Sequence, residues 1–186
     1  MTFFRFFREA PERTAGMALF QTLAFQSRRP EFFVAGQVPD TFDGRFDLLV
    51  LNASIVFRRV KACGPRGAKV AQVAFDLLFQ DFDQALREMG VGDLTVPKRI
   101  KDMGEAFYGR AVAYDKALEA ADVAALAGAL QRNLYGGHEA GGMQTVARYA
   151  QRLYDSLKEQ ADDDLCAGRV QFPELATVDI AAEVAP

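Results

Sequence analysis

The segment 46–57 is too apolar to lie on a protein surface, although it includes the polar residues Asn52 and Ser54. Its hydrophobic side chains follow helical spacing and cover almost the whole circumference of a helix. Such a helix is either buried in a protein core or spans a membrane. Because the segment is shorter than the ~20 residues that a bilayer requires, we expect a buried central helix.

Three charged residues lie where this apolar segment begins: Asp43, Arg45 and Asp47. An unpaired buried charge costs several kcal/mol. These side chains must therefore pair with one another or with a partner, and the pattern alone leaves both alternatives open.

The rest of the chain has the composition of a helical globular protein. Its 186 residues suffice for one good-sized core and are few for two. Half of them are hydrophobic, and helix-favouring Ala, Leu, Gln and Arg are common. The net charge of −3 argues against a protein whose main role is to bind DNA or RNA.

Hydrophobic periodicity predicts helices along most of the chain and no strands. We expect helices over about 12–28, 41–63, 68–89, 97–118, 122–135 and 143–164. The last of these would end on three acids, at the negative end of its dipole: Asp162, Asp163, Asp164. The prediction is an all-α, single-domain bundle of about six to seven helices around a central buried helix.

The predicted helical domain spans 11–166, and an extended tail follows it over 167–186. An aromatic and basic segment, 1–10, precedes the domain. In this segment three aromatic side chains share a helical face beside two arginines: Phe3, Phe4, Phe7, Arg5, Arg8. This pattern indicates either a small interfacial membrane anchor or packing onto the chain's own core, and we leave both open.

The chemistry-bearing residues argue against catalysis. Carboxylates lie within the aromatic stretch 75–83, as they do in helices that hold a di-iron centre, but such a centre also needs two ExxH pairs. The one histidine, His138, lies in the glycine-rich loop 136–142, which lacks the Gly-Lys-Ser/Thr of a phosphate-binding loop. We interpret this loop as a flexible linker. We expect no enzyme activity, no metal and no cofactor, with a small helical enzyme or redox protein as a competing hypothesis.

Cysteine usage and the N-terminus bear on the compartment. Cys63 and Cys166 are far apart and form no CxxC motif, which indicates free thiols in a reducing compartment. The first residues lack the apolar stretch that export requires. We expect a cytoplasmic protein, or one bound peripherally to the cytoplasmic face of the inner membrane.

Several segments resemble the ubiquinol–cytochrome c chaperone family, in the family's order over roughly residues 30–160. They are VPDTFDGRFD at 38–47, FD and DFD within 75–83, LREMGVGDLTV at 86–96 and MGEAFYGR at 103–110. The resemblance implies an α-helical, non-enzymatic assembly factor that receives newly made cytochrome b for respiratory complex III. Mitochondrial members pair with a small partner protein and work near the ribosomal tunnel exit, so a small protein and the ribosome are further expected partners. This shorter sequence resembles a bacterial member.

The residue patterns, taken together with the matched segments, suggest roles for individual residues. We interpret Asp43, Arg45 and Asp47 as an internal ion-pair network that fixes the central helix. Arg110 is a candidate to meet either of two acids across the bundle: Asp76, Asp83. The candidates for contact with a client or with lipid are aromatic and basic: Phe3, Phe4, Phe7, Lys98, Arg99, Lys101, Phe107, Tyr108.

The basic residues Lys98, Arg99 and Lys101 crowd the first turn of a predicted helix, where the helix dipole disfavours cations. Nearby acids would neutralise them, or an anionic partner would: lipid headgroups, RNA or an acidic protein. The competing hypothesis is therefore a ribosome- or RNA-associated factor that binds through two basic clusters: Lys98, Arg99, Lys101, Arg58, Arg59, Lys61.

Overall fold

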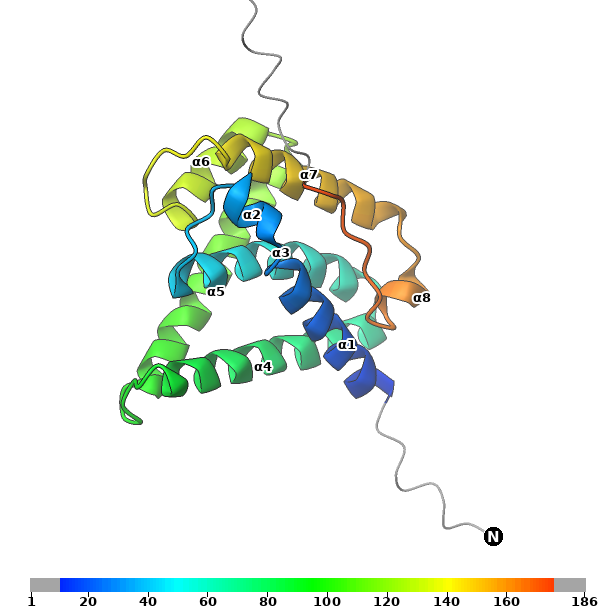
Figure 1. Ribbon diagram of the computed structural model, residues 1–186. Coiled ribbons are helices and arrows are strands. Elements are labelled where there is room, and N and C mark those ends of the chain that lie inside the picture. Colours follow the sequence, from blue (N-terminus) through cyan, green and yellow to red (C-terminus); the bar gives the residue numbers. More distant parts are fainter. Residues whose placement is uncertain (1–10, 176–186) are drawn as a thin grey trace, which may run out of the picture.

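The computed structural model describes residues 11–175, and within that range the chain forms eight helices and no strand. Several of the other helices pack against α3 at the centre (Figure 1). In chain order the helices are α1 (Pro11–Gln26), α2 (Pro30–Val34), α3 (Phe42–Ala62), α4 (Pro65–Glu88), α5 (Val96–Glu119), α6 (Val123–Asn133), α7 (Met143–Glu159) and α8 (Asp162–Leu165). The all-α, single-domain prediction is confirmed. The short helices α2 and α8 were not among the predicted elements.

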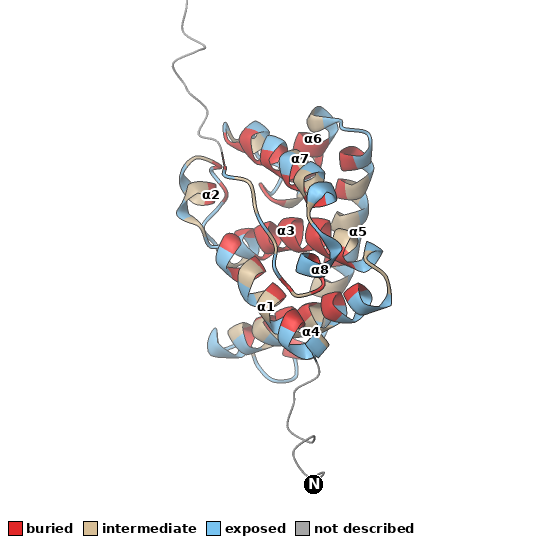
Figure 2. Ribbon diagram, turned by 90° about the vertical axis from the view of Figure 1, so that its right-hand side faces the viewer, coloured by how far each residue is buried: buried red, intermediate tan, exposed pale blue. Residues whose placement is uncertain are grey.

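The central helix α3 is buried along most of its length (Figure 2). Every residue of the segment 46–57 is buried, as the sequence predicted. Thr41 caps the start of the helix, because its Oγ1 accepts a hydrogen bond from Gly44 N at 3.1 Å. It packs against α1, α4, α5 and α7. A helix covered on so many sides fixes the positions of the helices that contact it.

The turn between α3 and α4 is shorter than the four-residue break that the sequence predicted at 64–67. Only Cys63 and Gly64 lie between the two helices. Gly64 has a φ of 89°, which a residue with a side chain rarely adopts. Pro65 follows as the first residue of α4, a position that proline favours because its ring fixes a helical φ.

The predicted last helix is wrong in one respect: it is two helices, α7 and α8. The chain turns at Gln160, which has an extended backbone conformation, so Asp162–Asp164 open α8 instead of ending α7. Acids favour the first turn of a helix, where the dipole is positive. Arg59 fastens this turn, because it donates to Leu157 O at 2.9 Å and to Asp162 Oδ1 at 2.6 Å.

The glycine-rich loop between α6 and α7 is fastened to the segment that follows α2. Gly142 approaches Gly36 so closely that a Cβ there would lie 2.1 Å from Gly36 O. Gln37 Oε1 accepts a hydrogen bond from Gly141 N at 3.1 Å, and the Tyr135 hydroxyl donates to Gly36 O at 2.6 Å. The interpretation of this loop as a flexible linker therefore misses its role, which is to hold two segments together.

A chain of buried polar side chains connects α1, α3 and α7. Tyr149 donates its hydroxyl hydrogen to Asn52 Oδ1 at 2.7 Å and accepts from Gln26 Nε2 at 3.1 Å. Asn52 Nδ2 in turn donates to Ser27 Oγ at 3.1 Å. All four residues are buried, so each polar group finds in its neighbours the bonds that water would otherwise supply.

The described end of the chain, 169–175, runs without regular secondary structure and ends on the buried Leu175. Gln171 donates its backbone N–H to Gln160 Oε1 at 2.9 Å, and Gln160 Nε2 donates to Gln171 O at 2.8 Å. Across residues 11–175, no helix combines the length and the apolar character needed to cross a bilayer.

Candidate functional site

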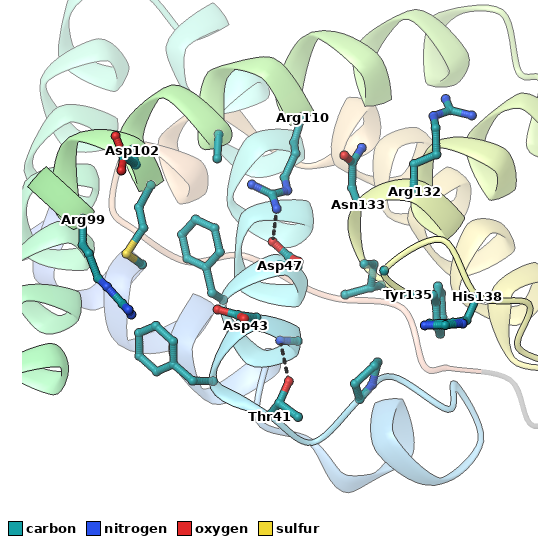
Figure 3. A pocket seen from close by; sticks show the side chains of 18 of the residues that line it. Thr41, Asp43, Asp47, Arg99, Asp102, Arg110, Arg132, Asn133, Tyr135 and His138 are labelled. Carbon is teal, nitrogen blue, oxygen red and sulfur yellow. Dashed lines mark hydrogen bonds and ion pairs between the residues drawn. The ribbon is translucent and has the colours of Figure 1, made fainter. Parts of the chain in front are cut away.

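A cavity of about 610 Å³ lies between the first turns of α3, the middle of α5 and the end of α6 (Figure 3). Its apolar walls come from different helices: Phe42, Phe46, Leu86, Met103, Ala106, Leu134. Its polar lining includes residues that the sequence singled out, Asp43, Asp47, Arg99 and Arg110. The cavity is therefore the place where the motif residues of α3 and α5 meet.

The charged floor of the cavity is the pair Asp47 and Arg110. Arg110 Nη2 lies 2.9 Å from Asp47 Oδ1, and the side chains are 20% and 8% exposed. Burial raises the pKa of the Asp47 carboxyl from 3.8 to about 7, the charge of Arg110 lowers it, and the charge of Asp43 raises it. One arginine thus only partly offsets the cost of burying this carboxylate.

The hydrogen bonding of this pair is incomplete. Neither Asp47 Oδ1 nor Arg110 Nε, both buried, has a partner with hydrogen-bond geometry among the described residues. The Arg110 guanidinium also lies over the Phe46 ring, 5.4 Å from its centroid. Tyr114 packs beside the pair, and burial raises the pKa of its hydroxyl. Both Asp47 Oδ1 and Arg110 Nε are closed to solvent.

Charges of both signs surround the floor. Asp43, Arg99, Asp102, Arg132 and His138 line the cavity and are exposed. The carboxylates and guanidiniums that line it balance: three acids face three arginines once the floor pair is included. A ligand without net charge fits such a lining best.

Sequence reasoning missed one wall of the cavity. This wall comes from the end of α6 and the turn that follows it, and consists of Arg132, Asn133 and Tyr135. None of these residues belongs to a recognisable motif. They lie near α3 because α6 packs against α5 and α7. The one available signal was Tyr135, an aromatic residue directly before the glycine-rich loop.

The structure corrects the predicted ion pairs. Arg45 binds the exposed Asp40 at 2.6 Å and not an acid of the apolar segment. The expected partners of Arg110 are also wrong: Asp83 binds Arg87 at 2.5 Å, and Asp76 accepts from a glutamine on the exposed face of α4. Arg110 instead binds Asp47, the last residue of the matched segment 38–47. The predicted network is therefore a single pair between α3 and α5.

The aromatic residues of α4 and α5 form a cluster next to the cavity. The Phe75 ring lies 4.6 Å from Phe79 and 5.2 Å from Phe107. Phe107 is 4% exposed, whereas Tyr108 is 57% and Val112 is 70% exposed. Of the two aromatic residues of α5 proposed to contact a client, Tyr108 offers the larger surface. Phe3, Phe4 and Phe7 lie outside the described residues.

The basic turn opens α5 as predicted, next to exposed apolar side chains. Lys101 lies 3.6 Å from Glu105, while within residues 11–175 neither Lys98 nor Arg99 forms an ion pair. The preceding loop exposes Leu94 by 98% and a methionine by 58%. Neutralisation by neighbouring acids is therefore only partial.

The described residues hold no group of three or more His, Cys, Asp and Glu side chains that could bind a metal ion. Both cysteines are free thiols, Cys63 half-buried and Cys166 buried. Burial raises the pKa of Cys63 to about 11, so little of this thiol is the reactive thiolate at neutral pH.

Comparisons with known proteins agree with the geometry of the fold. Residues 35–172 match the family model for the ubiquinol-cytochrome C chaperone. The crystal structure of the Cbp3 homolog from Brucella abortus superposes with a TM-score of 0.81 at 34% sequence identity, over 89% of this chain and 92% of that one.

Curated relatives are similar over most of this chain and part of their own. The ubiquinol-cytochrome c reductase complex assembly factor 1 of Mus musculus is 24% identical over 88% of this chain and 56% of its own length. The mitochondrial protein CBP3 of Saccharomyces cerevisiae is 30% identical over 76% of this chain and 44% of its own. The chain thus spans about half the length of these relatives.

Proposed function

This chain belongs to the ubiquinol–cytochrome c chaperone family, and we propose that it acts without catalysis as an assembly factor for the ubiquinol–cytochrome c reductase complex, respiratory complex III. Its client would be newly made cytochrome b. The relatives named as assembly factors of this complex support the role, although they are about twice as long. The small partner protein and the ribosome expected from the resemblance remain part of the proposal.

One observation carries this proposal: residues 35–172 match the family model. Every residue that lines the cavity, from Pro39 to His138, lies inside the matched range 35–172. The lining includes no serine or cysteine, and its one buried carboxylate is paired with an arginine. This arrangement favours holding a ligand over attacking one.

Capture of the client tests the function. The full chain, carrying an affinity tag, would be expressed in a bacterium that makes complex III, and membrane proteins bound to it would be identified by mass spectrometry. We expect cytochrome b among them, enriched over the abundant subunits of other respiratory complexes. Recovery of no complex III subunit would contradict the proposal, and recovery of ribosomal proteins alone would favour the RNA-associated alternative.

We also propose that the start of α5 contacts the membrane surface. Lys98, Arg99 and Lys101 extend from one turn, and Leu94 projects beside them. Basic side chains attract anionic headgroups and an exposed leucine gains by entering the bilayer interface, so the two together suit peripheral contact. This contact would keep the chaperone close to a client that is a membrane protein.

Replacing Lys98 and Lys101 by glutamine is expected to weaken binding to vesicles rich in anionic lipid roughly thirtyfold, since each basic residue contributes about 1 kcal/mol. Co-sedimentation with vesicles measures the change. The matched control replaces Arg66 and Lys69, exposed cations of α4 far from this turn, with glutamine and should bind nearly as the parent does. Equal losses in both variants, or binding indifferent to salt, would contradict the proposed surface.

A further inference from the structure

We propose that the cavity between α3, α5 and the end of α6 binds a short, uncharged and apolar segment of a polypeptide. The inference deepens the proposed function, because it rests on the chain having a polypeptide client, and it names the site and chemistry of recognition.

The first argument is the chemistry of the floor. Asp47 is 5% exposed and lines the cavity, and its Oδ1 lies 2.9 Å from Arg110 Nη2. The charges of Asp47 and Arg110 therefore compensate each other within the floor, and a charged ligand would find no unpaired partner there.

The second argument is the charge of the lining. Asp43, Asp47 and Asp102 are matched by Arg99, Arg110 and Arg132. A ligand of either charge would therefore meet repulsion from about as many groups as attract it. Together with the apolar walls, this balance selects an uncharged segment with hydrophobic side chains, as membrane proteins possess in abundance.

The third argument is size and shape. A volume of about 610 Å³ falls within the ~300–1,000 Å³ of typical ligand sites. It suits a few side chains and not a whole helix. The contact of Gly142 with Gly36 and the bond from Tyr135 to Gly36 fix one rim of the cavity. The site therefore exists before the ligand arrives, which reduces the entropy lost on binding.

A cavity-filling variant tests the site without breaking its buried pair. Ala106 is half-buried and lines the cavity. The control is Ala68→Trp, which adds the same side chain to an exposed position of α4. The probes are short peptides tiled along cytochrome b, titrated by fluorescence anisotropy. We expect uncharged apolar peptides to bind the parent and Ala68→Trp equally, and Ala106→Trp at least about tenfold more weakly.

A second measurement needs no variant. In the parent protein, backbone amide signals that shift on peptide addition should belong to residues around the cavity, such as Gly44, Ala106 and Gly136. Shifts confined to other faces of the molecule would overturn the inference. So would equal binding of Ala106→Trp, or a preference for peptides whose bound segment carries a charge.

The two proposals fail in different ways. If tagged parent protein captures cytochrome b and Ala106→Trp, folded as judged by its thermal unfolding, captures it equally well, the cavity is not the docking site and the assembly role stands. If the parent protein captures no complex III subunit but binds the apolar peptides in the cavity, the site stands and the proposed client is wrong.

Discussion

Replacing Arg110 by methionine is expected to lower the free energy of unfolding by about 3–5 kcal/mol near pH 8. The guanidinium is the charge that lowers the pKa of the buried Asp47, so its loss leaves that carboxylate without compensation. Methionine keeps much of the packing against Phe46. Urea unfolding followed by circular dichroism measures the change as a shift in midpoint at constant slope.

The effect should depend on pH with a definite sign. The pKa of Asp47 is raised from 3.8 to about 7 in the folded state, so the proton binds the folded chain more tightly than the unfolded one. The contribution of this group to stability is complete below its unfolded pKa and is lost as the pH rises through the folded value. Near pH 5 Asp47 is largely neutral in the folded state. The difference in the free energy of unfolding between the parent protein and Arg110→Met should therefore be smaller there than near pH 8.

Two comparisons isolate the pair. Arg99→Met removes an exposed arginine of the same cavity that has no ion pair within the described residues, and should change stability by no more than about 0.5 kcal/mol. Asp47→Leu combined with Arg110→Met should recover most of the loss, because an apolar pair replaces a buried ionic one at little cost. An Arg110→Met protein as stable as the parent near pH 8 would show that the pair contributes nothing.

The pair Asp47 and Arg110 shows which part of the site could be predicted from the sequence and which part could not. The hydrophobic pattern predicted α3 because nearly every side of that helix is covered, and burial on all sides leaves a continuous signature. The pattern also required a partner for Asp47. It could not name Arg110, because the partner lies on α5 and is chosen by how two helices cross. Helical spacing records which residues share a face and carries no information about the neighbour of that face.

Helix ends were predicted less well, for a local reason. Gly64 and Gln160 end helices through single backbone conformations, one at positive φ and one extended. The glycine at position 64 predicted the end of α3 from the sequence. Glutamine ordinarily favours helix. Only the tertiary bonds of Arg59, to Leu157 O in the last turn of α7 and to Gln160 O just after it, explain the second helix end. The acids Asp162–Asp164 were a usable signal, since they suit the beginning of a helix better than its end.

Asn52 is the other residue whose loss should have a large effect. Asn52→Ala is expected to lower the free energy of unfolding by about 2–4 kcal/mol, since it leaves the buried Tyr149 hydroxyl without its acceptor and Ser27 without its donor. It also opens a small void in the centre of the core. Because the network lies outside the residues that line the cavity, peptide binding by the folded variant should be unchanged.

Matched variants separate the polar network from simple loss of volume. Ser54→Ala, two positions along α3, removes a buried hydroxyl whose bond is to the backbone of its own helix, and should cost about 1 kcal/mol or less. Tyr149→Phe removes only the hydroxyl group that donates a hydrogen bond to Asn52 Oδ1. If the two groups act together, the double variant Asn52→Ala with Tyr149→Phe should lose less than the sum of the single losses. Additive losses would mean that Asn52 and Tyr149 are not coupled, and that apolar contacts alone hold α1, α3 and α7 together.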